Sequence, residues 1–175
     1  EALTRFELDF RAHFVTVKQL FLDRFWVYGA SILGPNDTIS FQIGWPHWWL
    51  ALAALGIALF SRIKKEKRFL AIFLFAIFLI SLFMTHNKSA FIWEKIGILK
   101  YFQFPWRFLS LSVFSASILG GFTVSELKDK WKSVTAISIL VLTILLNWSY
   151  FKPGEFYNSL TDKEKLSGPL WEEQQ

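Results

Sequence analysis

The sequence contains no cysteine among its 175 residues. This absence excludes disulfide bridges, thiolate metal sites and a cysteine nucleophile. Histidine is also scarce, and its three residues do not have the spacing of a metal-binding motif. The phosphate-binding loop, the dinucleotide fingerprint and the HExxH and GxSxG motifs are absent as well. The enzyme classes that depend on these motifs are therefore excluded.

Charged residues are absent from four apolar runs, at 45–61, 69–85, 108–124 and 134–150. The chain is 53% hydrophobic, with 20 Phe and 9 Trp, and a soluble domain of this size would hardly bury so much apolar surface. Each run is close to the shortest length that crosses a bilayer, about 17 residues. The sequence therefore predicts an all-α fold: a polytopic membrane helix bundle with about four transmembrane helices, interfacial helices and outer-face loops.

The third apolar run begins at an aromatic and cationic segment, Phe102-Gln-Phe-Pro-Trp-Arg107. Pro105 suits the first turn of a helix because its φ angle is fixed and it has no N–H group. Trp106 and Arg107 are typical of the boundary between lipid headgroups and hydrocarbon. We therefore expect the third transmembrane helix to start here, at the membrane interface.

Small residues then recur along this third run. Ser112, Ala116 and Gly120 follow one another at four-residue spacing, and Ser117 and Gly121 lie beside them. Such a face lets a second helix approach closely. The pattern predicts a helix that packs inside the bundle.

The segment 1–44 is expected to hold an amphipathic helix followed by an ordered loop. Apolar side chains recur there at helical spacing, and charged residues interrupt them too often for a membrane span. The residues that set this spacing are Phe14, Val17, Phe21 and Phe25. The glycines, Pro35 and Asn36 that follow are turn formers, which indicates a loop over 26–44.

The numbers of lysine and arginine residues in the short loops predict how the chain is oriented in the membrane. The loops 62–68 and 126–132 carry eight of these residues, against three in the linker 86–106, so both loops are expected to be cytoplasmic. The segment 1–44, the linker and the polar tail 151–175 then share the extracytoplasmic face. We expect the linker to form a short interfacial helix or a re-entrant turn, and the tail to lead to a missing soluble part.

The net charge of +5 has the sign of a nucleic-acid-binding protein, but its location favours a membrane. The basic residues cluster beside the apolar runs and not on a face of a polar domain, so we expect no nucleic acid partner. Residue 1 is Glu, and no signal-peptide pattern opens the chain. The expected partners are therefore the lipid bilayer and the remainder of a longer polypeptide.

Arg107 is the strongest candidate for a binding residue, with Trp106 and Gln103 beside it. A guanidinium offers paired donors to a phosphate or pyrophosphate headgroup, and the start of a helix adds amide donors and a positive dipole. The alternative is that Arg107 only anchors the helix at the interface. Both interpretations stay open at this stage.

Other polar residues on the predicted outer face are weaker candidates. Asp37 and Gln42 can contact a sugar or coordinate a divalent cation, which would be the cofactor, but an aspartate in such a loop is more often a turn former. His86 and Glu94 can form an acid/base pair, and solvated loop polarity is the alternative. No catalytic residue follows from the sequence.

Two stretches resemble one family. Tyr101-Phe-Gln-Phe-Pro-Trp-Arg-Phe-Leu109 and Trp26-x-Tyr-Gly-x-Ser, continuing through Gly34 and Asp37 to Ser40-Phe-Gln-Ile-Gly44, are similar to the bacterial integral membrane proteins labelled "6-pyruvoyl-tetrahydropterin synthase-related". Nothing in the chain resembles the soluble pterin enzyme. These membrane proteins are similar in layout to GT-C-type glycosyltransferases.

The resemblance implies the membrane portion of a GT-C-like glycosyltransferase in the bacterial plasma membrane. Its substrate would be a polyprenyl-phosphate-linked sugar used in cell-envelope glycan assembly. The family's acidic catalytic residue lies in an amino-terminal outer loop that this chain lacks, so the catalytic base is expected outside this fragment. A lipid or polysaccharide transporter and a non-catalytic scaffold subunit are the alternatives.

The predicted orientation can be tested with single cysteines because the native chain has none. We expect Lys88→Cys in intact cells to react with a membrane-impermeant thiol reagent, because the linker 86–106 should be extracytoplasmic. Lys65→Cys should stay unlabelled until the cells are permeabilised. The reverse labelling pattern would show that the orientation is wrong.

Overall fold

The computed structural model describes residues 9–23, 29–32, 37–151 and 161. Every regular element in these residues is helical and none is a strand, which confirms the all-α fold. The α-helices are α1 Val17–Phe21, α2 Trp45–Phe60, α3 Lys65–Thr85, α4 Ala90–Lys95, α5 Leu109–Ser125 and α6 Asp129–Asn147. Short 3-10 helices lie between them: η3 Phe10–His13, η4 Asn87–Ser89, η5 Gly97–Phe102, η6 Pro105–Phe108 and η7 Trp148–Phe151.

Three helical stretches of the described chain are long and apolar enough to cross a membrane: Lys65–Thr85, Pro105–Ser125 and Asp129–Tyr150. They match three of the four predicted spans, and each begins three to five residues earlier than expected. The difference arises because polar and aromatic residues in front of each apolar run also join the helix. These lengths and compositions fit a membrane protein.

The remaining predicted span, the first apolar run at 45–61, forms α2, which is shorter than the other three helical stretches. α2 has 16 residues and ends at Phe60, and the backbone becomes extended at Ser61. A helix of this length rises about 24 Å, whereas the hydrocarbon core is about 30 Å thick. Gly44 precedes α2 with a φ of 95°, a conformation that L side chains rarely adopt, and this turn sets where the helix begins.

Small residues hold α2, α3 and α5 together. The predicted face of α5 is confirmed, since Ser112, Ala116 and Gly120 are all buried. α2 buries Ala51, Ala54 and Ala58, and α3 buries Ala71. A Cβ atom added at Gly120 would lie 3.2 Å from Cδ1 of Leu50, so the Leu50 side chain packs directly against this glycine. Ser117 and Gly121, expected beside this face, are exposed.

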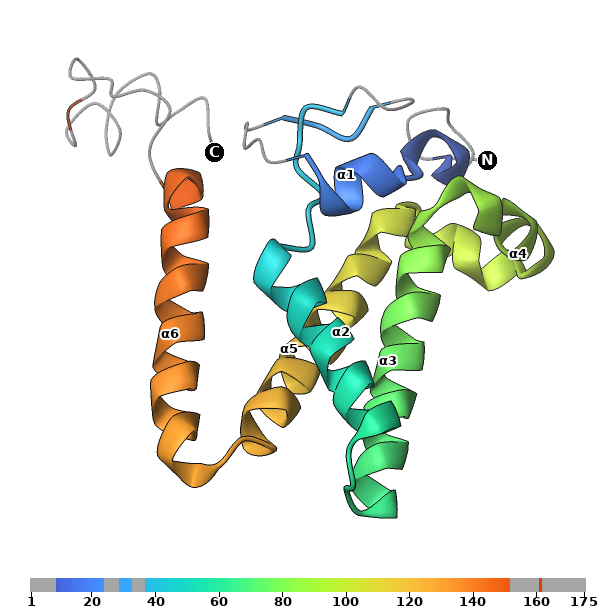
Figure 1. Ribbon diagram of the computed structural model, residues 1–175. Helices are drawn as coiled ribbons and strands as arrows, with labels where there is room; N and C mark the ends of the chain where they lie inside the picture. The colour runs from blue at the N-terminus through green and yellow to red at the C-terminus, as the bar shows by residue number, and fades with distance from the viewer. Residues whose placement is uncertain (1–8, 24–28, 33–36, 152–160, 162–175) are drawn as a thin grey trace. The chain divides into compact units, whose positions relative to one another are not determined.

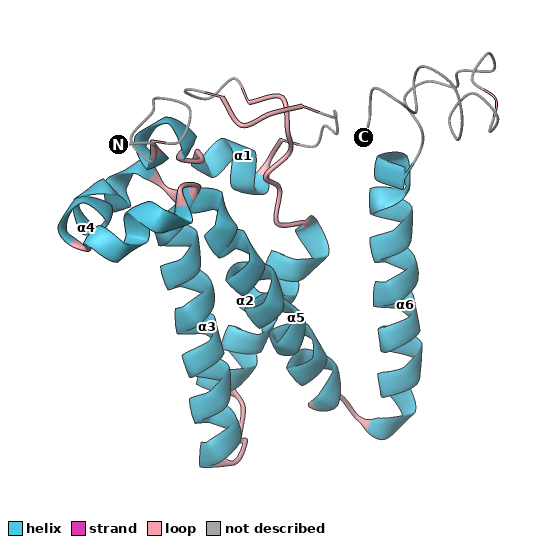
Figure 2. Cartoon of the chain, turned by 180° about the vertical axis from the view of Figure 1, so that it is seen from behind, coloured by secondary structure: helices cyan, strands magenta, loops and turns pink. Residues whose placement is uncertain are grey.

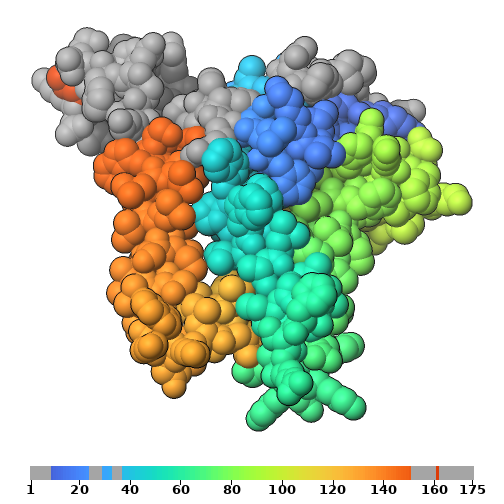
Figure 3. Space-filling view, in the orientation of Figure 1, coloured from blue at the N-terminus to red at the C-terminus, as the bar shows by residue number. Residues whose placement is uncertain are grey.

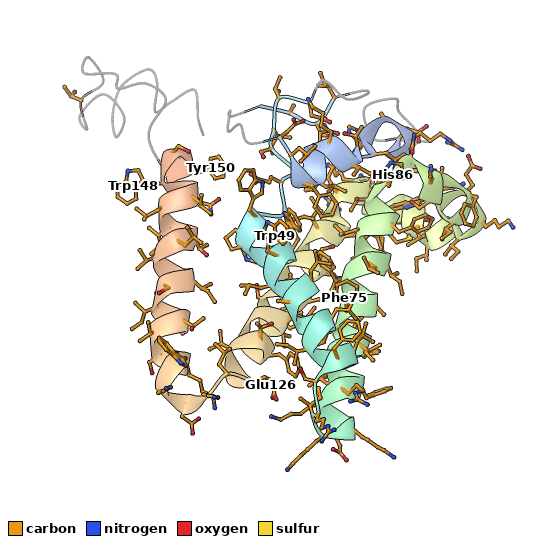
Figure 4. All side chains as sticks on the ribbon, in the orientation of Figure 1. Trp49, Phe75, His86, Glu126, Trp148 and Tyr150 are labelled. Carbon is orange, nitrogen blue, oxygen red and sulfur yellow. The ribbon has the colours of Figure 1, made fainter. Side chains whose placement is uncertain are left out.

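The large side chains of α3 divide between the bundle and the lipid side. Leu74, Phe75 and Phe78 are buried in the apolar core that α3 forms with α2 and α5. Phe69 and Phe73 are 73% and 51% exposed on the same helix. This division agrees with a span that faces lipid over much of its surface. Figure 4 labels Phe75 beside α2.

The connections gather at two opposite ends of the bundle. α1 and α4 lie at one end, which we call the α4 end, and the α2–α3 turn lies at the other, the turn end (Figures 1 and 2). Arg11 pairs with Glu94 at 3.1 Å at the α4 end, and Lys67 pairs with Glu126 at 2.6 Å at the turn end. The loops expected to share a side of the membrane therefore lie together.

The amino-terminal helix is shorter than its apolar spacing suggests. Thr16 and Gln19 form a capping box at its start, and α1 ends at Phe21 after five residues. The predicted continuation through Phe25 lies outside the described residues. The linker 86–106 forms η4, α4 and η5, in agreement with the short helix expected there.

The carboxy-terminal part divides from the rest. Residues 1–145 and 146–175 form two compact units. α6 buries none of its side chains. The predicted polar tail 151–175 lies almost wholly outside the described residues, so its position stays a prediction.

Replacement of Gly120 by leucine should destabilise the bundle by about 1–3 kcal/mol because the added side chain overpacks the contact with Leu50. Gly121→Leu is the matched control, since a Cβ there meets nothing within 4 Å. Thermal melting in detergent compares the two variants with the wild type. Equal melting temperatures for all three proteins would contradict the close-packing interpretation.

Candidate functional site

The segment that leads into α5 is held by a strained turn. Gln103 has a φ of 61° and a ψ of −47°, and the N–H of Phe104 donates to the carbonyl of Phe102 at 2.6 Å. This three-residue γ-turn is rare for a residue other than glycine. The helical stretch Pro105–Ser125 begins at Pro105, as the sequence predicts.

Aromatic rings form one wall next to this turn. Phe104 stacks on Trp106 with ring centroids 5.2 Å apart, and Phe41 of the preceding loop lies 5.8 Å from Trp106. The Arg107 guanidinium lies over the Phe104 ring, 5.1 Å from its centroid. The guanidinium is therefore held against a ring by a cation–π contact and not by a carboxylate.

An open cavity of about 500 Å³ joins the two segments. Its lining residues are Ile39, Ser40, Phe41, Trp106, Arg107, Leu109 and Ser110. The loop 37–44 therefore meets the start of α5, although about 65 residues separate them in the sequence. Figure 3 shows the amino-terminal part of the chain, in blue, lying against α2 and the 86–106 linker near this end.

Arg107 is exposed, and none of the described carboxylates pairs with it. Arg11, at the same end, differs because it pairs with Asp9 and Glu94 at 3.3 and 3.1 Å. The hydrogen bond with Glu94 is the main cause that raises the pKa of Arg11. The positive charge of Arg107 thus stays available to a ligand.

Asp37 does not point to a ligand. Its side chain is buried, and each carboxylate oxygen accepts a hydrogen bond, one from Gln19 Nε2 at 2.7 Å and one from the Ile32 N–H at 2.8 Å. These bonds tie the loop to α1. The described residues contain no group of three His, Asp or Glu side chains that could hold a metal ion. The divalent cation stays an untested expectation.

The two glutamines lie at the edge of the cavity and do not line it. The Gln42 N–H donates to the Ser40 hydroxyl at 3.4 Å, and Ser40 is a lining residue. Gln103 is half-buried at the γ-turn, one residue before Phe104. Both residues therefore shape the backbone around the cavity.

His86 and Glu94 take different partners. His86, at the end of α3 (Figure 4), accepts a hydrogen bond from the Lys88 N–H through Nδ1 at 3.2 Å and so caps η4. Glu94 accepts from the Arg11 guanidinium at 3.1 Å. The structure therefore gives each residue a structural role in place of a shared acid/base role.

Sequence reasoning missed part of the site. Phe41, Leu109 and Ser110 line the cavity but were not predicted as site residues. The available signals were that Phe41 and Leu109 lie in the two stretches that resemble one family, and that Ser110 lies three residues after Arg107 on a predicted helix. His13 has the packing role that is usual for a lone histidine in such a segment. It is buried, its Nδ1 lies 2.9 Å from the Ser31 hydroxyl oxygen, and its ring lies edge-on to Phe104 at 4.7 Å. His13 thus supports the aromatic wall from behind.

The chain was compared with protein-family models, with curated proteins and with solved structures, and none of them matches it. The resemblance of the 26–44 and 101–109 stretches to a family of bacterial membrane proteins therefore stays a prediction. What the chain can bind has to be argued from its own residues.

Asp37→Ala should lower the free energy of unfolding by about 1–3 kcal/mol because it leaves the buried Gln19 amide and the part-buried Ile32 N–H without their acceptor. Asp23→Ala is the control. Its partner Lys18 is 74% exposed, so loss of that ion pair should cost less than about 1 kcal/mol. Thermal melting in detergent measures both effects, and equal small shifts would overturn the structural role of Asp37.

Proposed function

We propose that the cavity beside Arg107 binds the phosphate of a polyprenyl-phosphate-linked sugar, and that the chain is the membrane portion of a GT-C-like glycosyltransferase. One observation carries this proposal. An unpaired guanidinium and a wall of aromatic side chains line the same cavity, at the end of a helix that is apolar enough to cross a membrane. A lipid phosphate has the matching chemistry, a compact anion joined to a long apolar chain.

The phosphate group is the more specific part of the match between such a lipid and the cavity. A guanidinium donates two parallel hydrogen bonds to a phosphate, and these charge-assisted bonds are stronger than neutral ones. The start of the helix adds a partial positive charge next to Arg107. The phosphate would therefore be held by a fixed fork and by the helix dipole together.

The apolar chain of such a lipid accounts for the aromatic side chains at the cavity. Phe41 and Trp106 lie 5.8 Å apart beside the cavity, and Leu109 continues the apolar wall into the span. Isoprenoid chains pack well against such flat side chains. Where this wall meets the hydrocarbon core, a lipid can place its phosphate at Arg107 and leave its chain in the bilayer.

The proposed chemistry is sugar transfer with the lipid phosphate as leaving group. The acceptor hydroxyl oxygen forms a bond to the anomeric carbon, and the bond from that carbon to the phosphate oxygen breaks with its electron pair going to the phosphate. The hydroxyl proton goes to a carboxylate base that we expect outside this chain. Arg107 would stabilise the charge that grows on the leaving phosphate.

The transporter and scaffold alternatives have less support. The four predicted spans contain no Asp, Glu, Lys or Arg, whereas charges within the membrane commonly mark transport pathways. A scaffold would not need an unpaired guanidinium against a ring. Under the proposal the protein is a bacterial plasma-membrane protein, with the cavity on the extracytoplasmic face.

Arg107→Lys and Arg107→Ala in the full-length protein test the proposed phosphate contact. Lysine reaches the interface as arginine does but lacks the planar fork, so Arg107→Lys should insert normally and bind polyprenyl phosphate more weakly. Arg107→Ala should weaken binding further, by roughly tenfold to a hundredfold. Binding of radiolabelled polyprenyl phosphate to protein in lipid nanodiscs measures these changes.

Arg11→Lys is the matched control for this experiment. It makes the same substitution at the same end of the bundle, at a guanidinium that already has two carboxylate partners. Its binding should equal that of the wild type. If Arg107→Lys also binds the lipid phosphate as tightly as the wild type, Arg107 is only an interfacial anchor.

A further inference from the structure

The α2–α3 turn carries the densest group of cations in the sequence. Five of the seven residues from 62 to 68 are lysine or arginine. They lie at the turn end, opposite the candidate site, where side chains with nitrogen tips extend away from the helices (Figure 4). We call Arg62, Lys64 and Lys65 the basic patch.

The basic patch forms no ion pair with the carboxylates that the structure describes. Arg62, Lys64 and Lys65 are exposed, and none of them pairs with a described carboxylate. The other two cations of the turn have partners. Lys67 pairs with Glu126 at 2.6 Å, and Arg68 Nη2 donates to the Ser61 carbonyl at 3.1 Å. The structure therefore separates cations that join helices from cations that face outward.

Aromatic side chains on both sides of the patch fix its depth. Phe60, at the end of α2, is 87% exposed, and Phe69, in the first turns of α3, is 73% exposed. Phenylalanine rings this exposed on an apolar helix are expected to lie in hydrocarbon. The cations between them then lie at the level of the lipid headgroups, and their apolar stems can reach along the interface.

We propose that the basic patch binds the headgroups of anionic glycerophospholipids in the leaflet at the turn end. Unpaired cations within one turn of chain favour phosphate-bearing lipids, because each cation near an anionic surface adds favourable binding energy. The flanking rings favour a lipid over a soluble anion, since a lipid provides both hydrocarbon for the rings and charge for the patch. This surface is separate from the Arg107 cavity and does not depend on the function proposed for it.

The triple variant Arg62→Gln/Lys64→Gln/Lys65→Gln tests the proposal. Purified wild-type protein in neutral detergent should bind added phosphatidylglycerol more tightly than phosphatidylcholine, as counted by native mass spectrometry. The variant should lose this preference. Each removed cation should weaken phosphatidylglycerol binding roughly fivefold, and all three on the order of a hundredfold. High salt should weaken the wild-type preference in the same direction.

Lys88→Gln/Lys95→Gln/Lys100→Gln is the matched control. It also removes three exposed, unpaired cations, but from the linker at the α4 end. The control should keep the preference for phosphatidylglycerol. If it loses the preference as fully as the patch variant does, or if the patch variant keeps it, the proposal is wrong.

The single variant Lys64→Gln serves if the triple variant does not insert. Lys64 is exposed, and its side chain makes no capping hydrogen bond at the start of α3, so the variant should insert normally. Its phosphatidylglycerol binding should fall roughly fivefold. Unchanged binding by a correctly inserted Lys64→Gln protein would also overturn the proposal.

Discussion

Close contact between small residues is the interaction on which the rest of the structure depends. In a bilayer the hydrophobic effect does not drive one apolar helix onto another, so association depends on packing and on hydrogen bonds between helices. Ser112, Ala116 and Gly120 provide the packing surface, and the Thr123 hydroxyl adds a hydrogen bond of 3.2 Å to the Leu50 carbonyl. This contact fixes how α5 crosses α2. The crossing in turn sets how the amino-terminal ends of the two helices lie relative to each other.

The candidate site follows from that crossing. The loop in front of α2 has to meet the segment in front of α5, and hydrogen bonds with α1 hold the loop in place. The Ile43 N–H donates to the Leu20 carbonyl at 3.1 Å, while Asp37 accepts from Gln19 at 2.7 Å. One wall of the cavity is thus fixed by buried polar bonds and the other by the start of a helix. Because this wall is already ordered, ligand binding does not carry the entropy cost of ordering the wall.

The sequence predicted the helices well because a bilayer makes composition nearly sufficient for locating them. It also placed α2 to within one residue, 45–61 against Trp45–Phe60, because Pro46 marks its start and the cations from Arg62 onward mark its end. The sequence predicted Arg107 as a site residue but not Phe41. Their proximity depends on tertiary packing between two segments that are distant in sequence. The sequence left two roles open for Asp37, although it favoured a turn former, because a structural carboxylate and a ligand carboxylate look the same in sequence. The hydrogen bonds from Gln19 and Ile32 are tertiary contacts that only the structure shows.

The cations at the two ends of the bundle fall into two groups, those with a carboxylate partner and those without one among the described residues. Arg11 and Lys67 pair with carboxylates and join segments that are distant in sequence, so their charges serve the fold. Arg107 and the basic patch have no partner among the described carboxylates, and under the two proposals both bind lipid phosphate. Their surroundings differ, however. Arg107 lies over a ring and lines a cavity, so a ligand there would be selected by its shape, whereas the patch lies between two exposed phenylalanines, so its contact with lipid would depend mainly on charge. The same physical attraction can therefore support a specific substrate site at one end and a general lipid contact at the other.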